Sequence, residues 1–115
     1  MSRDSILSQK SKAFAKRIVM LYRYLTDERK EFVLSKQILR SGTSIGANIA
    51  EAIYAGSRKD FLARLHIAQK EAAETLYWIE LLADCEYLPE NLYKSLYKDC
   101  NELMSMLVAT TKPSS

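Results

Sequence analysis

Residues that break helices are scarce in this chain, which has only three glycines and two prolines among 115 residues. Because Gly and Pro supply most tight turns, so few of them favour a small number of long elements. The sequence contains no run of about 18 apolar residues, so we expect no membrane-spanning helix. The N-terminus also lacks the apolar stretch of a signal peptide. We therefore expect a cytoplasmic protein with no membrane partner.

Cysteine and histidine are almost as scarce. Cys85 and Cys100 have neither CxxC spacing nor a histidine nearby, and both fall at helical, mostly apolar positions. We interpret them as small buried thiols in a reducing compartment, with a helix-to-helix disulfide as the less favoured alternative. His66 is the single histidine. It falls on the polar arc of its helix without an orienting partner for general-base work, which favours an exposed surface residue.

Signatures of metal and phosphate binding are missing as well. Glu71 and Glu74 are three residues apart, and Glu51 belongs to another helix. A ferritin-like di-metal site needs Glu-x-x-His on two helices, and no Glu of this chain has a His three residues later. Gly42 and Gly46 lie inside a helical segment, so they do not form a phosphate-binding loop. We expect no enzymatic activity, no metal and no cofactor.

Helical periodicity covers most of the chain. Apolar residues recur at helical spacing and predict helices over about 6–25, 28–55, 58–85 and 89–109, followed by a frayed polar tail over 110–115. Short connections make consecutive helices antiparallel neighbours. The sequence therefore predicts an all-α, up-down-up-down four-helix bundle that spans residues 1–115 as one domain.

Capping residues suggest where these helices begin and end. Asp27 is a candidate N-cap of the second helix, and Gly56 occupies the place of a C′ glycine after it. Ser57, with Asp60 three residues later, resembles a capping box for the third helix. Pro89 suits the first turn of the fourth helix, where its missing N–H does no harm.

The segment RSGTSIGANIAEAIY, from Arg40 to Tyr54, combines helical spacing with two glycines one turn apart. A glycine inside a helix costs about 0.5–1 kcal/mol relative to alanine, so two on one face need a packing reason. The simplest reason is that a neighbouring helix approaches the backbone closely at Gly42 and Gly46. We expect this segment to lie at the centre of a tightly packed helical assembly.

The third helix carries more apolar surface than one bundle needs. Ile67, Trp78 and Leu81 lie well away from its main apolar face, on a flank that also holds Glu71 and Glu74. A surplus of this kind favours a subunit interface. The alternative is a scattered set of apolar surface residues, which is common in monomers.

The sequence also resembles a known family. The runs RSGTSIGANIAEA, SRKDF and HIAQKEAAETLYWIELL are similar to those of the four-helix bundle proteins first met as open reading frames in 23S ribosomal-RNA intervening sequences. The similarity extends from about Ile6 to Val108, and its most specific part is the run from Ser44 to Glu51. Where many members have glycine after the Ala-Glu pair, this chain has Ala52.

The resemblance implies a ring- or barrel-shaped homopentamer of four-helix bundles. It also implies a relation to the accessory proteins of diversity-generating retroelements, which are associated with a reverse transcriptase and with nucleic acid. The residues that match featured positions of the family pattern are Arg40, Asn48, Glu51, Phe61 and Glu74. We expect Glu51 and Glu74 to pair with Arg40 or Arg64 and to bond Asn48 near an interface, where they would keep the helices in register.

Basic residues form three groups, one on each of the first three helices: Lys12, Lys16 and Arg23; Lys36 and Arg40; Arg58 and Lys59. The last group opens its helix, and a helix N-terminus also attracts phosphate. The alternative, which stays open, is that each group is simply part of an ordinary solvent-exposed helix face and binds nothing. In a ring each group is repeated about the axis, so that weak phosphate contacts add.

We therefore predict a non-enzymatic homo-oligomer, pentameric by resemblance, that contacts structured RNA or another nucleic acid through backbone phosphates. The net charge of +3 permits such binding without demanding it. Base-specific reading is not supported, because the sequence has no RNA-recognition motif, zinc finger or aromatic stacking platform. The competing hypothesis is a protein-interaction scaffold that docks a partner such as a reverse transcriptase.

Overall fold

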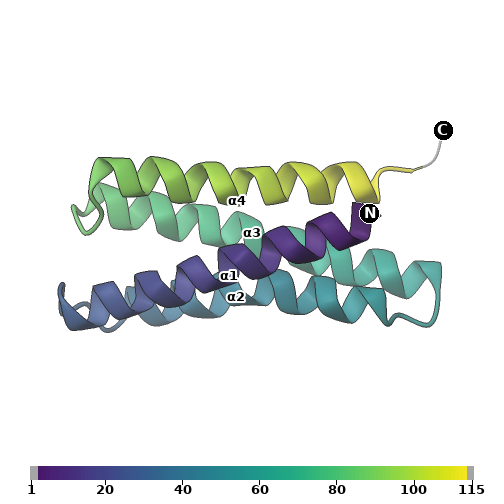
Figure 1. The fold of residues 1–115 in the computed structure, drawn as a ribbon, viewed down its shortest axis with the longest axis horizontal. Helices are drawn as coiled ribbons and strands as arrows, with labels where there is room; N and C mark the ends of the chain where they lie inside the picture. The colour runs from purple at the N-terminus through teal and green to yellow at the C-terminus, as the bar shows by residue number, and fades with distance from the viewer. Residues whose placement is uncertain (1–2, 114–115) are drawn as a thin grey trace.

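The chain folds into four long helices joined by short connections (Figure 1). The computed structural model describes residues 3–113, with side chains from residue 6 onward. Its helices are α1 (Arg3–Asp27), α2 (Leu34–Ile53), α3 (Arg58–Asp84) and α4 (Glu90–Thr111). Consecutive helices run antiparallel, and the described range contains no strand. The predicted all-α four-helix bundle is confirmed.

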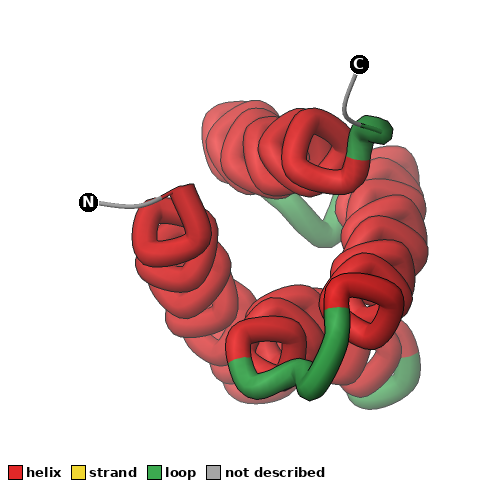
Figure 2. Tube along the Cα trace, turned by 90° about the vertical axis from the view of Figure 1, so that its right-hand side faces the viewer, coloured by secondary structure: helices red, strands yellow, loops and turns green. Residues whose placement is uncertain are grey.

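The four helices stand at the corners of a square when the bundle is seen end-on (Figure 2). Each helix therefore packs against two neighbours, and the backbones of the diagonal pairs α1/α3 and α2/α4 stay more than 8 Å apart, measured between Cα atoms. The packing is uneven, because α1 shares far fewer contacts with α4 than with α2. The side of the bundle between α1 and α4 is thus its most open side.

The predicted apolar faces form the core. On α1 and α4 the fully buried apolar side chains are Leu7, Phe14, Ile18, Leu21, Leu25, Leu96, Cys100, Leu103 and Leu107. Buried hydroxyl side chains also occur, and two of them form a pair between α2 and α3. Thr75 Oγ1 of α3 lies 2.9 Å from Ser41 Oγ of α2 and 2.7 Å from the carbonyl oxygen of Glu71. This pair satisfies polar groups that would otherwise be costly to bury between α2 and α3.

The first connection corrects the predicted start of the second helix. Residues 28–33 are not helical: α1 continues to Asp27, and α2 begins at Leu34. Asp27 is therefore not an N-cap. The cap is the buried carboxylate of Glu31, which accepts the backbone N–H groups of Val33, Leu34 and Ser35 at 2.6–3.2 Å. Burial alone would raise the pKa of Glu31, but these backbone hydrogen bonds lower it overall.

At the other helix ends, the predicted cap of α3 is confirmed and the predicted end of α2 is corrected. The N-cap at Ser57 is confirmed, because its hydroxyl accepts the backbone N–H of Asp60 at 3.1 Å. Gly56 is not a left-handed C′ residue: α2 already ends at Ile53, and no glycine has a positive φ. Pro89 stands directly before α4.

The C-terminal end of α4 is longer than predicted. This helix continues to Thr111, so residues 110 and 111 do not belong to a tail. The extra turn is held by α3, since Gln69 Nε2 donates to Thr111 Oγ1 at 2.6 Å. Residues 114 and 115 of the predicted tail lie outside the described residues.

The two cysteines differ from each other. Cys100 is buried as predicted, and burial raises its pKa to about 12. Cys85 follows the last residue of α3 and is exposed, so its predicted burial was wrong. Both thiols are free.

Candidate functional site

The outer side of the α2–α3 seam holds a cluster of ion-paired residues, which we call the Trp78 face: Arg40, Glu71, Glu74 and Trp78. The Arg40 guanidinium lies between two carboxylates of α3, with Nη1 at 3.0 Å from Glu71 Oε2 and Nη2 on Glu74 Oε2. Trp78 Nε1 donates to the same Glu74 oxygen at 3.0 Å. The bond from Trp78 is the main reason that the pKa of Glu74 is lowered; Arg40 adds to it and burial opposes it. Of the two partners that the sequence left open for Glu74, the structure shows Arg40.

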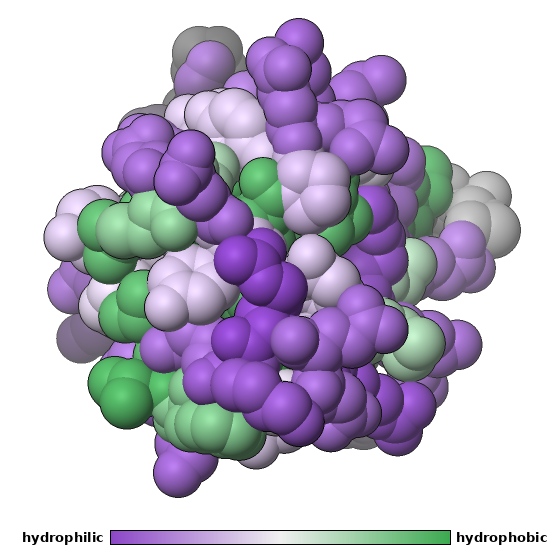
Figure 3. All heavy atoms as spheres, turned by 90° about the vertical axis from the view of Figure 1, so that its left-hand side faces the viewer, coloured by the Kyte–Doolittle hydropathy of each residue, from purple (hydrophilic) through white to green (hydrophobic). Residues whose placement is uncertain are grey.

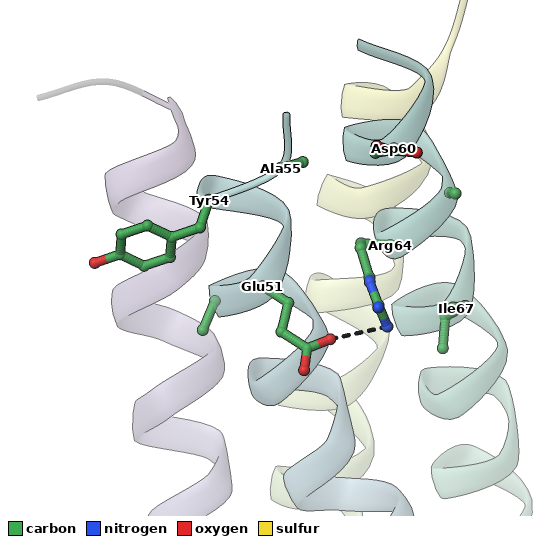
Figure 4. A pocket seen from close by; sticks show the side chains of 8 residues that line it. Glu51, Tyr54, Ala55, Asp60, Arg64 and Ile67 are labelled. Atoms are coloured by element: carbon green, nitrogen blue, oxygen red, sulfur yellow. Dashed lines mark ion pairs between the residues drawn. The ribbon is translucent and has the colours of Figure 1, made fainter. Parts of the chain in front are cut away.

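A second ion pair lies nearer the other end of the same seam. Arg64 Nη1 of α3 is 2.9 Å from Glu51 Oε2 of α2, so Arg64 is the partner of Glu51 among the two that the sequence left open. The two side chains meet across a surface recess of about 790 Å³ between the end of α2 and the start of α3 (Figure 4). Tyr54, 88% exposed, and Ile67, 40% exposed, also line this recess. It combines apolar walls with one ion pair, which suits a contact surface better than a reaction centre.

Asn48 takes no part in these ion pairs. Its Nδ2 donates to the carbonyl oxygen of Ser44 in its own helix at 2.9 Å, so the predicted bond to a carboxylate was wrong. The three apolar residues expected on the flank of α3 do not form one continuous patch. Trp78 and Leu81 are half-buried, whereas Ile67 lies by the recess, about 16 Å away along the helix. Subunit contacts at these residues stay a prediction.

Both helical glycines face α1. A Cβ atom at Gly42 would lie only 2.8 Å from Ile18 Cγ1 and 2.9 Å from Ile18 Cγ2, which no real packing allows. A Cβ at Gly46 would meet Ser11 Oγ at 3.4 Å, an ordinary contact. The predicted close approach is therefore confirmed, most strictly at Gly42. Its partner is α1 of the same chain.

The basic stripe of α1, defined as Lys12, Lys16 and Arg23, is exposed along its whole length. None of the three makes an ion pair with another described residue. Other cations of α1 are neutralised by α4: Lys10 Nζ is 2.8 Å from Glu102 Oε1, and Arg17 Nη1 is 2.7 Å from Asp99 Oδ2. The stripe thus carries positive charge that no ion pair among the described residues neutralises.

The remaining predicted basic residues do not join this stripe. Arg40 is occupied by its two carboxylates, although Lys36 is exposed beside it. Arg58 lies over the ring of Phe61 at 5.5 Å, and Lys59 is exposed at the start of α3. Because α3 is diagonal to α1, Arg58 and Lys59 lie on a different side of the bundle from the stripe, and Arg40 of α2 is held toward α3 by its two ion pairs. The seven residues do not make one surface within a single copy.

A groove between α1 and α4 was missed by the sequence reasoning. This α1–α4 groove has a volume of about 470 Å³ and is lined by Lys16, Arg17, Met20, Leu21, Tyr24, Leu92 and Leu96. Leu21 and Leu96 are core residues at its floor, whereas Met20 is 59% exposed. The only signal in the sequence was that Met20 and Tyr24 lie off the core face of α1. Periodicity alone does not say that two helices part there.

No chemical centre emerges among the residues that the structure describes. No group of three or more His, Cys, Asp or Glu side chains is placed to hold a metal ion within that range. His66 is exposed. In the same part of the chain, none of the helices has the length and apolar character to cross a membrane.

These features define a small antiparallel four-helix bundle whose distinctive residues form ion pairs, a basic stripe and an apolar groove. The chain belongs to the family of 23S rRNA-intervening sequence proteins, whose model matches residues 3–109. A 1.70 Å crystal structure of a protein with unknown function, from the S23 ribosomal protein family of Bacteroides thetaiotaomicron VPI-5482, is similar to it at 53% identity. The TM-score is 0.95, and the match covers 97% of this chain and 100% of that one. No curated protein matches the sequence.

Proposed function

We propose that this protein is a non-enzymatic, self-associating protein that binds RNA or another nucleic acid through backbone phosphates. The observation that carries the proposal is the uneven distribution of charge. The residues of α1 include six basic and two acidic side chains, whereas the rest of the chain has eleven basic and twelve acidic ones. The net charge of +3 therefore comes from one helix.

The basic stripe is placed to meet a polyanion. Lys12, Lys16 and Arg23 occupy about 16 Å of one helix face, opposite the buried face of α1. Cations without a partner in their own chain gain most from contact with phosphates, because each phosphate that they neutralise releases condensed counterions. Such contacts carry no sequence information, so we expect little preference between nucleic-acid sequences.

Self-association makes a short stripe more effective. One copy offers few phosphate contacts, whereas a ring repeats the same stripe around its axis and raises the effective concentration of each further contact. The half-buried Trp78 and the 59%-exposed Tyr77, whose ring centroids are 5.1 Å apart, support an interface on α3. The assembly that we propose is the pentameric ring implied by the family resemblance.

The test is a charge reversal of Lys12 and Arg23, the two residues of the stripe that do not line the α1–α4 groove. Wild-type protein and the Lys12→Glu/Arg23→Glu variant are titrated into a folded RNA hairpin and an unrelated duplex, followed by fluorescence anisotropy at low and moderate salt. We expect wild type to bind both, more weakly as salt rises. The variant should lose about ten-fold or more in affinity at unchanged oligomer mass.

The matched control is Lys70→Glu/Lys98→Glu, which changes the net charge equally with exposed lysines of α3 and α4. This control should bind much more tightly than the stripe variant. An equal loss in both variants would mean that only net charge matters. If wild type forms no complex with RNA or DNA at low salt, nucleic-acid binding is wrong.

The second candidate is the protein-interaction scaffold, and one observation favours it. Phe32 and Val33, in the connection between α1 and α2, are 54% and 69% exposed. Figure 3 looks onto this end of the bundle, where hydrophilic side chains cover most of the surface and hydrophobic groups show between them in several places. An exposed apolar pair at a bundle end suits docking of a protein better than contact with phosphates.

A further inference from the structure

We propose that the α1–α4 groove receives an unpaired base of the nucleic acid whose phosphates lie on the basic stripe. Such a site rests on the nucleic-acid binding proposed above and names its substrate class: strands with unpaired bases, in preference to a perfect duplex. Three features of the structure support it. The groove adjoins the stripe, its walls are apolar, and both of its ends are bounded.

The groove and the basic stripe share one edge of α1. Lys16 belongs to the stripe and also lines the groove. Met20 forms the groove wall one turn further along the helix, and Arg23 Nη1 lies 3.7 Å from its sulfur. Residues three and four positions apart are neighbours on a helix surface, so the two cations flank Met20. A strand whose phosphates contact Lys16 and Arg23 therefore passes along the rim of the groove.

The groove presents mostly apolar surface. Its floor is the bundle core at Leu21 and Leu96. Its walls carry Met20, which is 59% exposed, and the half-buried side chains of Tyr24 and Leu92. A nucleobase has two flat faces that pack on such side chains, on aromatic rings above all, and its polar edges stay hydrated in a groove that is open to solvent. Every base has these faces, so the contact adds affinity without reading sequence.

The charges around the groove also suit a strand of phosphates. The lining includes two cations, and no carboxylate among the described residues belongs to it. Arg17 is neutralised by Asp99 of α4 at 2.7 Å, whereas Lys16 makes no ion pair within the described part of the chain. Lys16 is thus placed to meet the phosphate next to a base that enters the groove.

Cross-links between α1 and the α4 side limit what the groove can hold. The ion pair of Arg17 with Asp99 closes one end. Beyond the other end, Arg29 Nη1 donates to the carbonyl oxygen of Tyr87 at 2.9 Å, which joins the connection after α1 to the connection before α4. The α1 wall between these cross-links, from Lys16 to Tyr24, is about 12 Å long.

A bounded groove of this size suits a compact group better than a partner helix. Its volume of about 470 Å³ lies in the usual range of small-ligand sites. A docked helix places anchors over two or more turns and continues past both ends, so it needs an open trough. A base that hangs from a strand on the rim fits between the two cross-links.

A perfect duplex cannot make this contact. Its bases are paired and stacked inside the helix, so phosphates and sugars reach the rim while Met20 and Tyr24 stay uncovered. An unpaired base turns outward at a smaller cost, because it has no partner to lose. We therefore expect the stripe to bind any nucleic acid and the groove to select those with an unpaired base.

The test compares two RNA duplexes of the same sequence, one of which has a single extra, unpaired adenosine. Binding is followed by fluorescence anisotropy at low salt. We expect wild type to bind the bulged duplex about five-fold or more tightly than the paired one, the lower end of what stacking of one base contributes. Met20→Ser and Tyr24→Leu should each lower this ratio toward one. Both should keep paired-duplex affinity within about two-fold, because the phosphate contacts remain.

Two controls show whether the effect belongs to the groove. Tyr77→Leu makes the same change as Tyr24→Leu at a 59%-exposed tyrosine of α3, and it should keep the preference for the bulged duplex. Lys12→Glu/Arg23→Glu should weaken binding of both duplexes by the same factor, so that the ratio is retained. Circular dichroism checks that every variant is folded.

A fluorescent base reports the contact directly. With 2-aminopurine in place of the unpaired adenosine, the emission should change when wild type or Tyr77→Leu saturates the RNA. The change should be much smaller with Met20→Ser, whose substitution at an exposed position leaves the core of the bundle intact. This measurement decides the question if Tyr24→Leu does not fold.

The outcomes separate this site from the nucleic-acid binding on which it rests. Equal binding of both duplexes by wild type overturns the base site and leaves nucleic-acid binding in place. A preference that both groove variants retain also overturns it, because the base then binds elsewhere. If wild type binds neither RNA, both proposals are wrong. Weaker binding of an acidic amphipathic peptide to Met20→Ser than to wild type would then assign the groove to a protein helix.

Discussion

Helix α1 meets its two neighbours in opposite ways. Toward α2 it packs almost against the backbone, since Gly42 leaves room for Ile18 and Gly46 for Ser11. Toward α4 it is held by two ion pairs, Lys10 with Glu102 and, at mid-helix, Arg17 with Asp99, and the groove separates the two helices from Lys16 and Arg17 onward. Close packing on one side and partial contact on the other leave α1 anchored by α2.

The two sides of α1 should therefore differ in how much they contribute to folding stability. Side chains between α1 and α2 are already in contact, so substitutions there act on folding. Side chains around the groove are only partly covered, so substitutions there are expected to change the free energy of unfolding less. The largest effects on the free energy of unfolding should therefore come from the α2 side of α1.

Gly42→Leu should give the largest loss of stability, so it is the strongest test of the difference between the two sides of α1. Its side chain would collide with Cγ1 and Cγ2 of Ile18, which already lie 2.8 and 2.9 Å from the position of a Cβ. We expect a loss of about 3 kcal/mol in the free energy of unfolding, the upper part of the usual range for overpacking. Urea denaturation followed by circular dichroism measures it.

Gly46→Ala is the control for this substitution. Its Cβ would make an ordinary 3.4 Å contact with Ser11 Oγ, and alanine has the better helix propensity. Stability should stay within about 0.5 kcal/mol of wild type or rise slightly. Equal losses in Gly42→Leu and Gly46→Ala would show that the two glycines are equivalent and that the closest approach is not at Gly42.

A smaller effect is expected at the connection that ties α2 to α1. Glu31→Gln removes the charge that holds the first N–H groups of α2, at a cost of about 1 kcal/mol at pH 7. The pKa of Glu31 is lowered in the folded protein, so its contribution is present above the unfolded pKa. It is lost as pH falls through the folded pKa. The difference between wild type and variant should therefore shrink between pH 5 and pH 3, and a difference independent of pH would contradict this cap.

The smallest effect is expected on the α4 side. Arg17 and Asp99 form a partly exposed ion pair, with 35% and 44% of their side chains accessible. A double-mutant cycle with Arg17→Ala and Asp99→Ala should give a coupling of about 0.2–1 kcal/mol, reduced further by salt. If the coupling energy exceeded the stability lost in Gly42→Leu, α1 would be held more strongly by α4 than by α2, which would contradict the difference described above.

Some features of the site were predictable from local pattern. Opposite charges on neighbouring helices led us to expect that Glu51 and Glu74 pair with Arg40 or Arg64, and the structure shows which pairs form: Arg40 with Glu74 and Arg64 with Glu51. The helix caps were harder to predict. A capping residue can be identified only when the first residue of its helix is known, and apolar spacing locates that residue poorly. Glu31 precedes α2 by three residues and acts through a bend that includes Lys30 at a φ of 54°. The spacing of apolar residues carries no sign of that bend.

The sequence by itself determined the four helices, their buried faces and their antiparallel order, because the 3.6-residue repeat and the short connections are properties of each segment. Only the tertiary structure decided what each surface residue faces. That Arg40 lies between Glu71 and Glu74, that Gly42 admits Ile18 and that α1 parts from α4 all depend on how the helices cross. The crossing is set by all core side chains packing together, and no single segment contains that information.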